Sequence, residues 1–156
     1  MLLAALPTAA CGYAVGSGLH ERGVRTVHLR AIANDTFRQR LEAELGAAVA
    51  RELAVSSDLL PATAAGADAI LELRIETEHE RTLVTGDRAA PVREGSQSAR
   101  VRMVLIERRS GRTLIDRDIA DRAEFRDPIG EDLTSARREL VDDLARKIVL
   151  ALETGF

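Results

Sequence analysis

The chain has 156 residues and a mass of 16.9 kDa, which is enough for one domain with a single hydrophobic core. Hydrophobic residues make up 46% and charged residues 30% of the chain, a composition that excludes wholesale disorder. A formal net charge of −3 and an aromatic content of 3% argue against a nucleic-acid-binding protein, which needs a basic surface and stacking platforms.

The first ten residues predict a targeting segment rather than folded structure. Residues 1–10 read MLLAALPTAA, an apolar run that is too short to span a bilayer and that ends in two small residues. Together with Cys11, the only cysteine, residues 8–11 resemble a bacterial lipobox, in which cleavage before the cysteine is coupled to its acylation. We therefore expect residues 1–10 to be a lipoprotein signal peptide and Cys11 to carry the lipid. The alternative is an ordinary thiol after an ordinary N-terminus.

Residues 11–23 contain four glycines and indicate a lipidated N-terminus followed by a tether. The residue after the cysteine is Gly12 rather than an aspartate, which by the usual lipoprotein sorting rule implies the outer membrane. We therefore expect the folded domain to extend from residue 24 to residue 156.

The next segment predicts a strand and then a helix. Apolar and polar side chains alternate over residues 24–32, which is typical of a half-buried strand. Asn34-Asp35-Thr36 then offers oxygens that cap a helix start. Apolar residues follow at steps of four and predict an amphipathic helix of about five turns: Phe37, Leu41, Leu45, Val49 and Leu53. Residues 56–66, which include Pro61, indicate a connection.

Three further strands are predicted, joined in sequence. The first spans residues 69–78, with a charged face opposite an apolar face made of Ala69, Leu71, Leu73, Ile75 and Thr77. A polar loop punctuated by Gly86, Pro91 and Gly95 leads to the second, over residues 98–106. A Ser-Gly turn in residues 108–112 then predicts a hairpin into the last strand, over residues 113–125.

The end of the chain predicts a second amphipathic helix. Pro128 stops the last strand, and a helix with one apolar stripe begins near Glu131. The order is therefore βαβββα. It predicts an α+β two-layer sandwich, in which both helices cover one face of a four-stranded, mostly antiparallel sheet.

The sequence contains little that predicts catalysis. The three histidines lie in different predicted elements without metal-ligand spacing, and nucleophile-elbow, phosphate-loop and dinucleotide motifs are absent. The best carboxylate cluster is explained as solvated strand charges, because its members point to different faces of one strand: Asp116, Asp118 and Asp121. We therefore expect no enzyme activity, no cofactor and no metal.

Several short motifs together resemble a known family. They are Cys11-Gly12-Tyr13, residues 24–32 leading into Asn34-Asp35-Thr36-Phe37, the hairpin at residues 108–111, and the terminal residues 153–156. In this order they resemble the LPS-assembly lipoprotein family, LptE, over nearly all of the mature chain. The resemblance implies a non-enzymatic protein anchored in the inner leaflet of the outer membrane. Such proteins plug a large β-barrel translocon, LptD, help it assemble, and help deliver lipopolysaccharide to the outer leaflet.

The resemblance also implies contact between basic residues and lipopolysaccharide. Arg74, Arg100 and Arg102 lie on the polar face of the predicted sheet and are the candidates for this contact by charge and face. A guanidinium group suits phosphate because its planar fork donates two hydrogen bonds at once. The alternative is a salt-bridged sheet face, in which Glu72 and Glu76 neutralise these arginines.

Two other classes of protein stay open from the sequence. One is a scaffold lipoprotein of another envelope or secretion complex that uses a similar α+β module. The other is a periplasmic small-ligand binder or enzyme, which would need a pocket with convergent polar groups.

Overall fold

The computed structural model describes residues 18–37, 40–86, 88 and 92–154. The predicted signal peptide and Cys11 lie outside the described residues. In chain order the elements are α1 (Gly18–Glu21), β1 (Thr26–Leu29), β2 (Ala33–Asn34), α2 (Leu41–Ser56), β3 (Leu60–Pro61), β4 (Ala69–Thr85), β5 (Val92–Glu107), β6 (Thr113–Arg126), η1 (Asp127–Ile129) and α3 (Leu133–Thr154).

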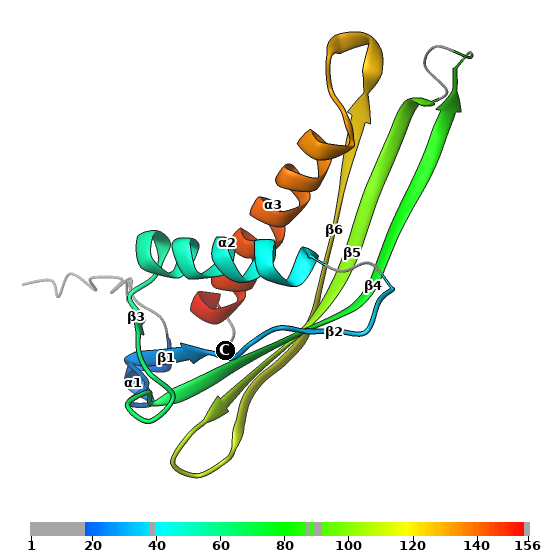
Figure 1. Ribbon diagram of the computed structural model, residues 1–156. Coiled ribbons are helices and arrows are strands. Elements are labelled where there is room, and N and C mark those ends of the chain that lie inside the picture. Colours follow the sequence, from blue (N-terminus) through cyan, green and yellow to red (C-terminus); the bar gives the residue numbers. More distant parts are fainter. Residues whose placement is uncertain (1–17, 38–39, 87, 89–91, 155–156) are drawn as a thin grey trace, which may run out of the picture.

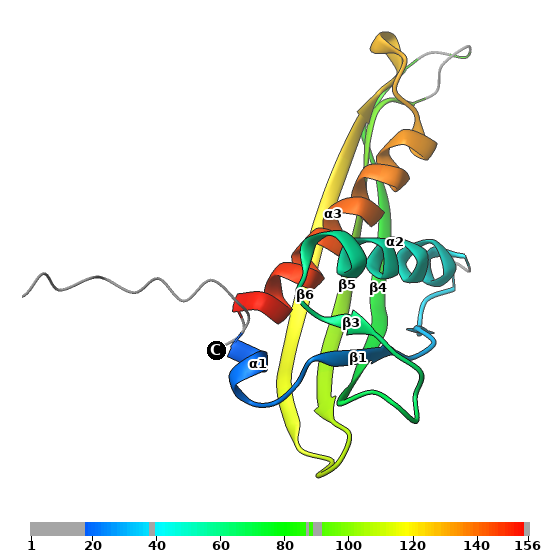
Figure 2. The same ribbon diagram turned by 90° about the vertical axis from the view of Figure 1, so that its left-hand side faces the viewer.

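The strands form one mixed sheet with the order β3-β1-β4-β5-β6, and β2 pairs with β4 further along (Figure 1). β1 is parallel to both β3 and β4, whereas β4–β5 and β5–β6 are antiparallel. Both long helices lie on the same side of this sheet (Figures 1 and 2). The predicted α+β fold and element order are confirmed. The sheet is larger than the four strands expected, because short strands form at residues 33–34 and 60–61.

The core lies between the helices and the sheet. From α2 it receives the stripe predicted by the four-residue spacing, with Leu45 and Val49 fully buried. From α3 it receives a longer stripe that includes Leu140, Leu144 and Ile148. The opposite face of the sheet carries no helix in the described part of the chain, and it therefore presents its side chains to the surroundings.

The start of α2 differs from the expectation. Phe37 is fully exposed and lies outside the helix, which begins only after Arg40. Asn34 does not cap it, because its Oδ1 accepts hydrogen bonds from the backbone N–H and hydroxyl of Thr36 (2.9 and 2.7 Å) and closes a turn. The carboxylate of Glu42, inside the first helical turn, instead accepts the backbone N–H of Arg40.

A β-bulge in β4 corrects the predicted faces of that strand. The pairing register shifts between Ile75 and Thr77, so that Glu76 is the extra residue. Alternation therefore holds only up to Ile75. Beyond the bulge, Thr77 is exposed rather than buried, and Glu78 turns to the helix side, where it is only 9% exposed and accepts a hydrogen bond from Gln97.

The loop predicted between the strands at residues 69–78 and 98–106 is shorter than expected, because β4 extends to Thr85 and β5 begins at Val92. Gly95 belongs to β5 and pairs with Phe125 of β6. A Cβ atom at Gly95 would lie 2.6 Å from Cε1 of Phe125 and closer still to Cζ. Glycine is needed here to admit the aromatic ring, and not to form a turn.

Both ends of the fold also differ slightly from the predicted boundaries. Leu19 in α1 is fully buried, so α1, which lies within the segment expected as a tether, packs onto the domain through this side chain. α3 begins at Leu133, where Asp132 and Ser135 cap each other's backbone N–H groups (2.8 and 2.9 Å). No described helix is long and apolar enough to cross a membrane.

Candidate functional site

The face of the sheet opposite the helices contains the arginines predicted as candidates. Arg74, Arg100 and Arg102 are all exposed there, because each follows or precedes buried residues that point to the helices. Arg74 in β4 and Arg102 in β5 are direct cross-strand neighbours. Like charges at such positions repel, so this arrangement needs counter-charges nearby.

A hollow of about 350 Å³ lies over this pair of arginines. It adds a third guanidinium, Arg30, which sequence reasoning did not select. Arg30 reaches the site because the chain between β1 and β2 runs alongside β4, with its backbone N–H bonded to the carbonyl of Leu71 (3.0 Å). The alternation over residues 24–32 puts Arg30 on a polar face, but it does not show that Arg30 lies beside β4. The lining residues are Arg30, Ala31, Ala33, Glu72, Leu73, Arg74, Arg102 and Val104, so Arg100 lies outside the hollow.

Carboxylates neutralise the two central arginines. Arg102 holds Asp116 of β6 through two parallel hydrogen bonds, Nε to Oδ1 at 3.0 Å and Nη2 to Oδ2 at 2.8 Å. This contact raises the pKa of Arg102 and lowers the pKa of the Asp116 carboxyl. Arg74 donates to both carboxylate oxygens of Asp35, at 2.9 and 3.1 Å.

The alternative of a salt-bridged sheet face is therefore correct, but the acids that pair with these arginines are not the two that it named. The acids that pair with the arginines are Asp35, Asp116 and, at 3.8 Å from Arg100, Asp118. Glu72 pairs with Arg30, and Glu76 is the bulge residue. Each of these acids lies outside the strand that holds its arginine, Asp35 after β2 and the other two in β6, so alternation within one strand cannot reveal the pairings.

These ion pairs are exposed, so a ligand can exchange with the carboxylates that hold the arginines. Arg74, Arg102 and their two carboxylates each keep between 44% and 54% of their side-chain surface in solvent. Exposed pairs contribute little to stability, because water screens them. A phosphate group can therefore replace a carboxylate at little cost, since it accepts the same two parallel hydrogen bonds from a guanidinium.

The aspartates of β6 form no shared carboxylate site. Asp116 and Asp118 lie on the arginine-bearing face, whereas Asp121 lies on the helix side and pairs with Lys147 of α3 at 2.9 Å. Among the described residues, no group of three or more His, Cys, Asp or Glu side chains could hold a metal ion.

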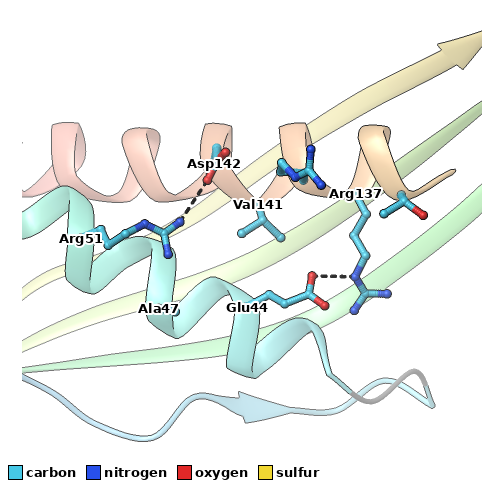
Figure 3. Close-up of a pocket in the computed structure, with 8 residues that line it drawn as sticks. Glu44, Ala47, Arg51, Arg137, Val141 and Asp142 are labelled. Carbon is cyan, nitrogen blue, oxygen red and sulfur yellow. Dashed lines mark hydrogen bonds and ion pairs between the residues drawn. The ribbon is translucent and has the colours of Figure 1, made fainter. Parts of the chain in front are cut away.

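A second cavity, of about 400 Å³, lies between α2 and α3 (Figure 3). Two ion pairs cross it: Glu44 with Arg137 at 2.8 Å, and Arg51 with Asp142 at 3.4 Å. Val141, which also lines the cavity, is almost completely buried. Because both pairs join one helix to the other, this cavity lies at a helix–helix contact rather than at a catalytic centre.

Solved structures with the same fold include several from bacteria. Protein CT253 from Chlamydia trachomatis is 17% identical, with a TM-score of 0.60 over 82% of this chain and 95% of that one. A lipoprotein from Caulobacter crescentus is 17% identical, with a TM-score of 0.52 over 80% and 89%. PelC from Paraburkholderia phytofirmans, which forms a dodecamer, is 15% identical, with a TM-score of 0.54 over 81% and 89%. These similarities concern the fold. No curated protein sequence matches the chain.

A family match covers the domain itself. Residues 24–152 match the LptE lipopolysaccharide-assembly family, a range that includes every described strand of the sheet, all of α2 and all but the last two residues of α3. The family is non-enzymatic and acts in lipopolysaccharide assembly at the outer membrane, which places the protein in the cell envelope. The match favours lipopolysaccharide assembly over the scaffold and ligand-binder alternatives. By this match over most of its sequence, the chain belongs to the LptE lipopolysaccharide-assembly family.

Proposed function

We propose that the protein is anchored to the outer membrane by a lipid on Cys11 and plugs an LptD-type β-barrel translocon. The anchor is supported by the lipobox-like residues 8–11 and by Gly12. The plug role is supported by family membership and by the helix-free, charged face of the sheet. Such a face suits the polar interior of a large outer-membrane barrel.

Within this role, the hollow on the sheet face contacts a phosphate group of lipopolysaccharide. The observation that carries this assignment is the convergence of Arg30, Arg74 and Arg102 around one hollow. On binding, phosphate oxygens take the places of the Asp35 and Asp116 carboxylates on Arg74 and Arg102. Arg100 lies outside the hollow, and its longer ion pair makes it a peripheral contact.

Lipopolysaccharide binding is tested on the double variant Arg74→Gln/Arg102→Gln. The matched control is Arg138→Gln/Arg146→Gln, which removes the same charge from α3 on the other side of the sheet. The hollow variant should bind at least about tenfold more weakly, since two charge-assisted contacts are lost. The control variant should bind like the wild type, and added salt should weaken the binding of the control and of the wild type. Equal binding by the two variants would show that the hollow is not the contact.

The anchor and the barrel are tested separately. Metabolic labelling with a fatty-acid analogue should mark the wild type and leave Cys11→Ala unmarked, and equal labelling of both would remove the anchor from the proposal. Affinity purification from detergent-solubilised outer membranes should recover a β-barrel partner. Recovery of no barrel would contradict the plug role, whatever the result with lipopolysaccharide.

A further inference from the structure

The end of the molecule where the described chain begins carries a cluster of exposed arginines. Two come from the corner between α1 and β1, and three come from the turn between β5 and β6. We call this cluster the arginine pole. It consists of Arg22, Arg25, Arg108, Arg109 and Arg112.

Asp68, just before β4, holds the two parts of the pole together. Its Oδ2 accepts the backbone N–H groups of Arg25 and Thr26, each at 3.0 Å, and the Thr26 hydroxyl at 2.8 Å. Its backbone carbonyl accepts the N–H of Arg108 at 2.8 Å. A small cavity of about 180 Å³ lies between the corner and the turn, which confirms that they are neighbours. α1 and the β5–β6 turn also share the lower end of the molecule in Figure 1.

Two acids next to the pole are engaged by hydrogen bonds and an ion pair. The carboxylate of Asp68 is directed at backbone N–H groups, which hold its pKa below the usual value. Glu107 accepts a hydrogen bond from the Ser110 hydroxyl and pairs with Arg112 at 3.7 Å. Glu21 lies in α1 beside the pole, and five exposed arginines gather at this end of a chain whose net charge is −3. The pole is therefore a positive end on a negative protein.

The pole also lies where a lipid anchor would hold the protein. The described chain begins at Gly18, in α1. If Cys11 is acylated, the linking residues 11–17 span at most about 25 Å even when fully extended. The pole then stays close to the headgroups of the bilayer that holds the acyl chains. A basic patch next to an acyl anchor is a known combination for stable membrane attachment.

We propose that the arginine pole docks on the anionic phospholipid headgroups of the bilayer. This inference rests on the proposed anchoring at Cys11 and adds to it a contact made by the folded domain. The guanidinium groups bind lipid phosphates directly and are attracted by the negative surface potential over about one Debye length. This contact holds the domain against the membrane at one defined end.

The test uses a chain that starts at Gly12, which retains every described contact because the described fold begins at Gly18. It is incubated with vesicles of phosphatidylcholine alone or with about 30% phosphatidylglycerol, a fraction that gives a negative surface potential, and sedimented. The pole variant is Arg25→Gln/Arg109→Gln/Arg112→Gln. The matched control is Arg51→Gln/Arg138→Gln/Arg146→Gln, which removes the same charge from α2 and α3. Thermal melts of both variants check that the fold is intact.

The wild type and the control should bind vesicles that contain phosphatidylglycerol at least about tenfold better than pure phosphatidylcholine, and added salt should reduce this binding. The pole variant should lose the preference. Equal binding to both vesicles, or a preference unchanged in the pole variant, would overturn the proposal. So would binding to lipopolysaccharide-containing vesicles but not to those with phosphatidylglycerol. Barrel recovery does not depend on this result, so failure of the plug role and failure of the pole are distinguishable.

Discussion

Gly95 and Gly46 show that the same residue type has opposite roles in one domain. At Gly95, an added Cβ atom would collide with the ring of Phe125. At Gly46, inside α2, the nearest atom to an added Cβ would be Cδ1 of Ile32 at 3.7 Å, an ordinary contact. Gly95 is needed to leave space for the Phe125 ring, whereas Gly46 only raises the conformational entropy of the unfolded chain.

Alanine substitutions at these glycines should therefore change stability in opposite directions. Gly95→Ala should lower the free energy of unfolding by about 2 kcal/mol or more, because the Phe125 ring must move in a packed region. Gly46→Ala should raise it by up to about 1 kcal/mol, through its better helix propensity. Urea unfolding of both variants measures the two changes. A stabilised Gly95→Ala would show that the ring has free space.

Asp68 should make the stability of the domain sensitive to acid. Its lowered pKa means that the folded state favours the ionised carboxylate. The stabilisation is fully present above the usual value near 3.8 and is lost as the pH falls below that value, through the folded-state pKa. Asp68→Ala should cost about 1–2 kcal/mol at neutral pH, allowing for solvent screening. The difference from the wild type should shrink in urea titrations below pH about 4, and a constant difference would contradict this role.

At the scale of single residues, the sequence predicted which way a side chain points better than what it touches. Alternation placed Arg74 and Arg102 on the polar face, and the structure agrees. Their partners lie elsewhere in the sheet, Asp35 directly after β2 and Asp116 in β6. The pairing of strands is not visible in the pattern of any one strand.

The two helices are the elements that the sequence predicted most directly. Their apolar residues recur with helical spacing, and the structure buries those stripes against the sheet. The boundaries were less accurate, because side-chain hydrogen bonds decide them. The sequence predicted that Asn34 caps a helix start, whereas in the structure its side chain closes a turn with Thr36. The bulge at Glu76 was equally invisible, since it is defined by the register against β5.

Charges placed on the buried stripes should unfold the domain. Leu45 and Leu144 are fully buried, so Leu45→Asp or Leu144→Asp leaves an unpaired charge in the core and should cost more than about 4 kcal/mol. Leu150 lies on the same helix as Leu144 but is 59% exposed, so Leu150→Asp should cost less than about 1 kcal/mol. Thermal melts distinguish the outcomes. Cooperative melting of Leu144→Asp at the wild-type temperature would show that the faces are wrongly assigned.

At the scale of the whole molecule, the fold class could be predicted but the neighbours in the sheet could not. The element order predicted two layers, and the structure has them. Nothing in the alternation of residues 24–32 showed that β1 lies parallel to β4, because alternation defines faces and not strand order. For the same reason the sequence could not place Arg30 in the candidate site, because Arg30 reaches the hollow only where the chain after β1 runs beside β4.

The position of β1 has a consequence for the order of folding. β4, β5 and β6 are joined by hairpins, so their pairing costs little loop-closure entropy. The pairing of Val27 in β1 with Ala69 in β4 closes a much longer loop, which includes all of α2, and therefore costs more. In pulsed hydrogen exchange during refolding, amides of β5 should therefore become protected before those of β1. Simultaneous protection would argue against this order. If the chain is anchored at Cys11 as proposed, the part of the sheet next to the anchor folds last, while the rest of the sheet is already formed.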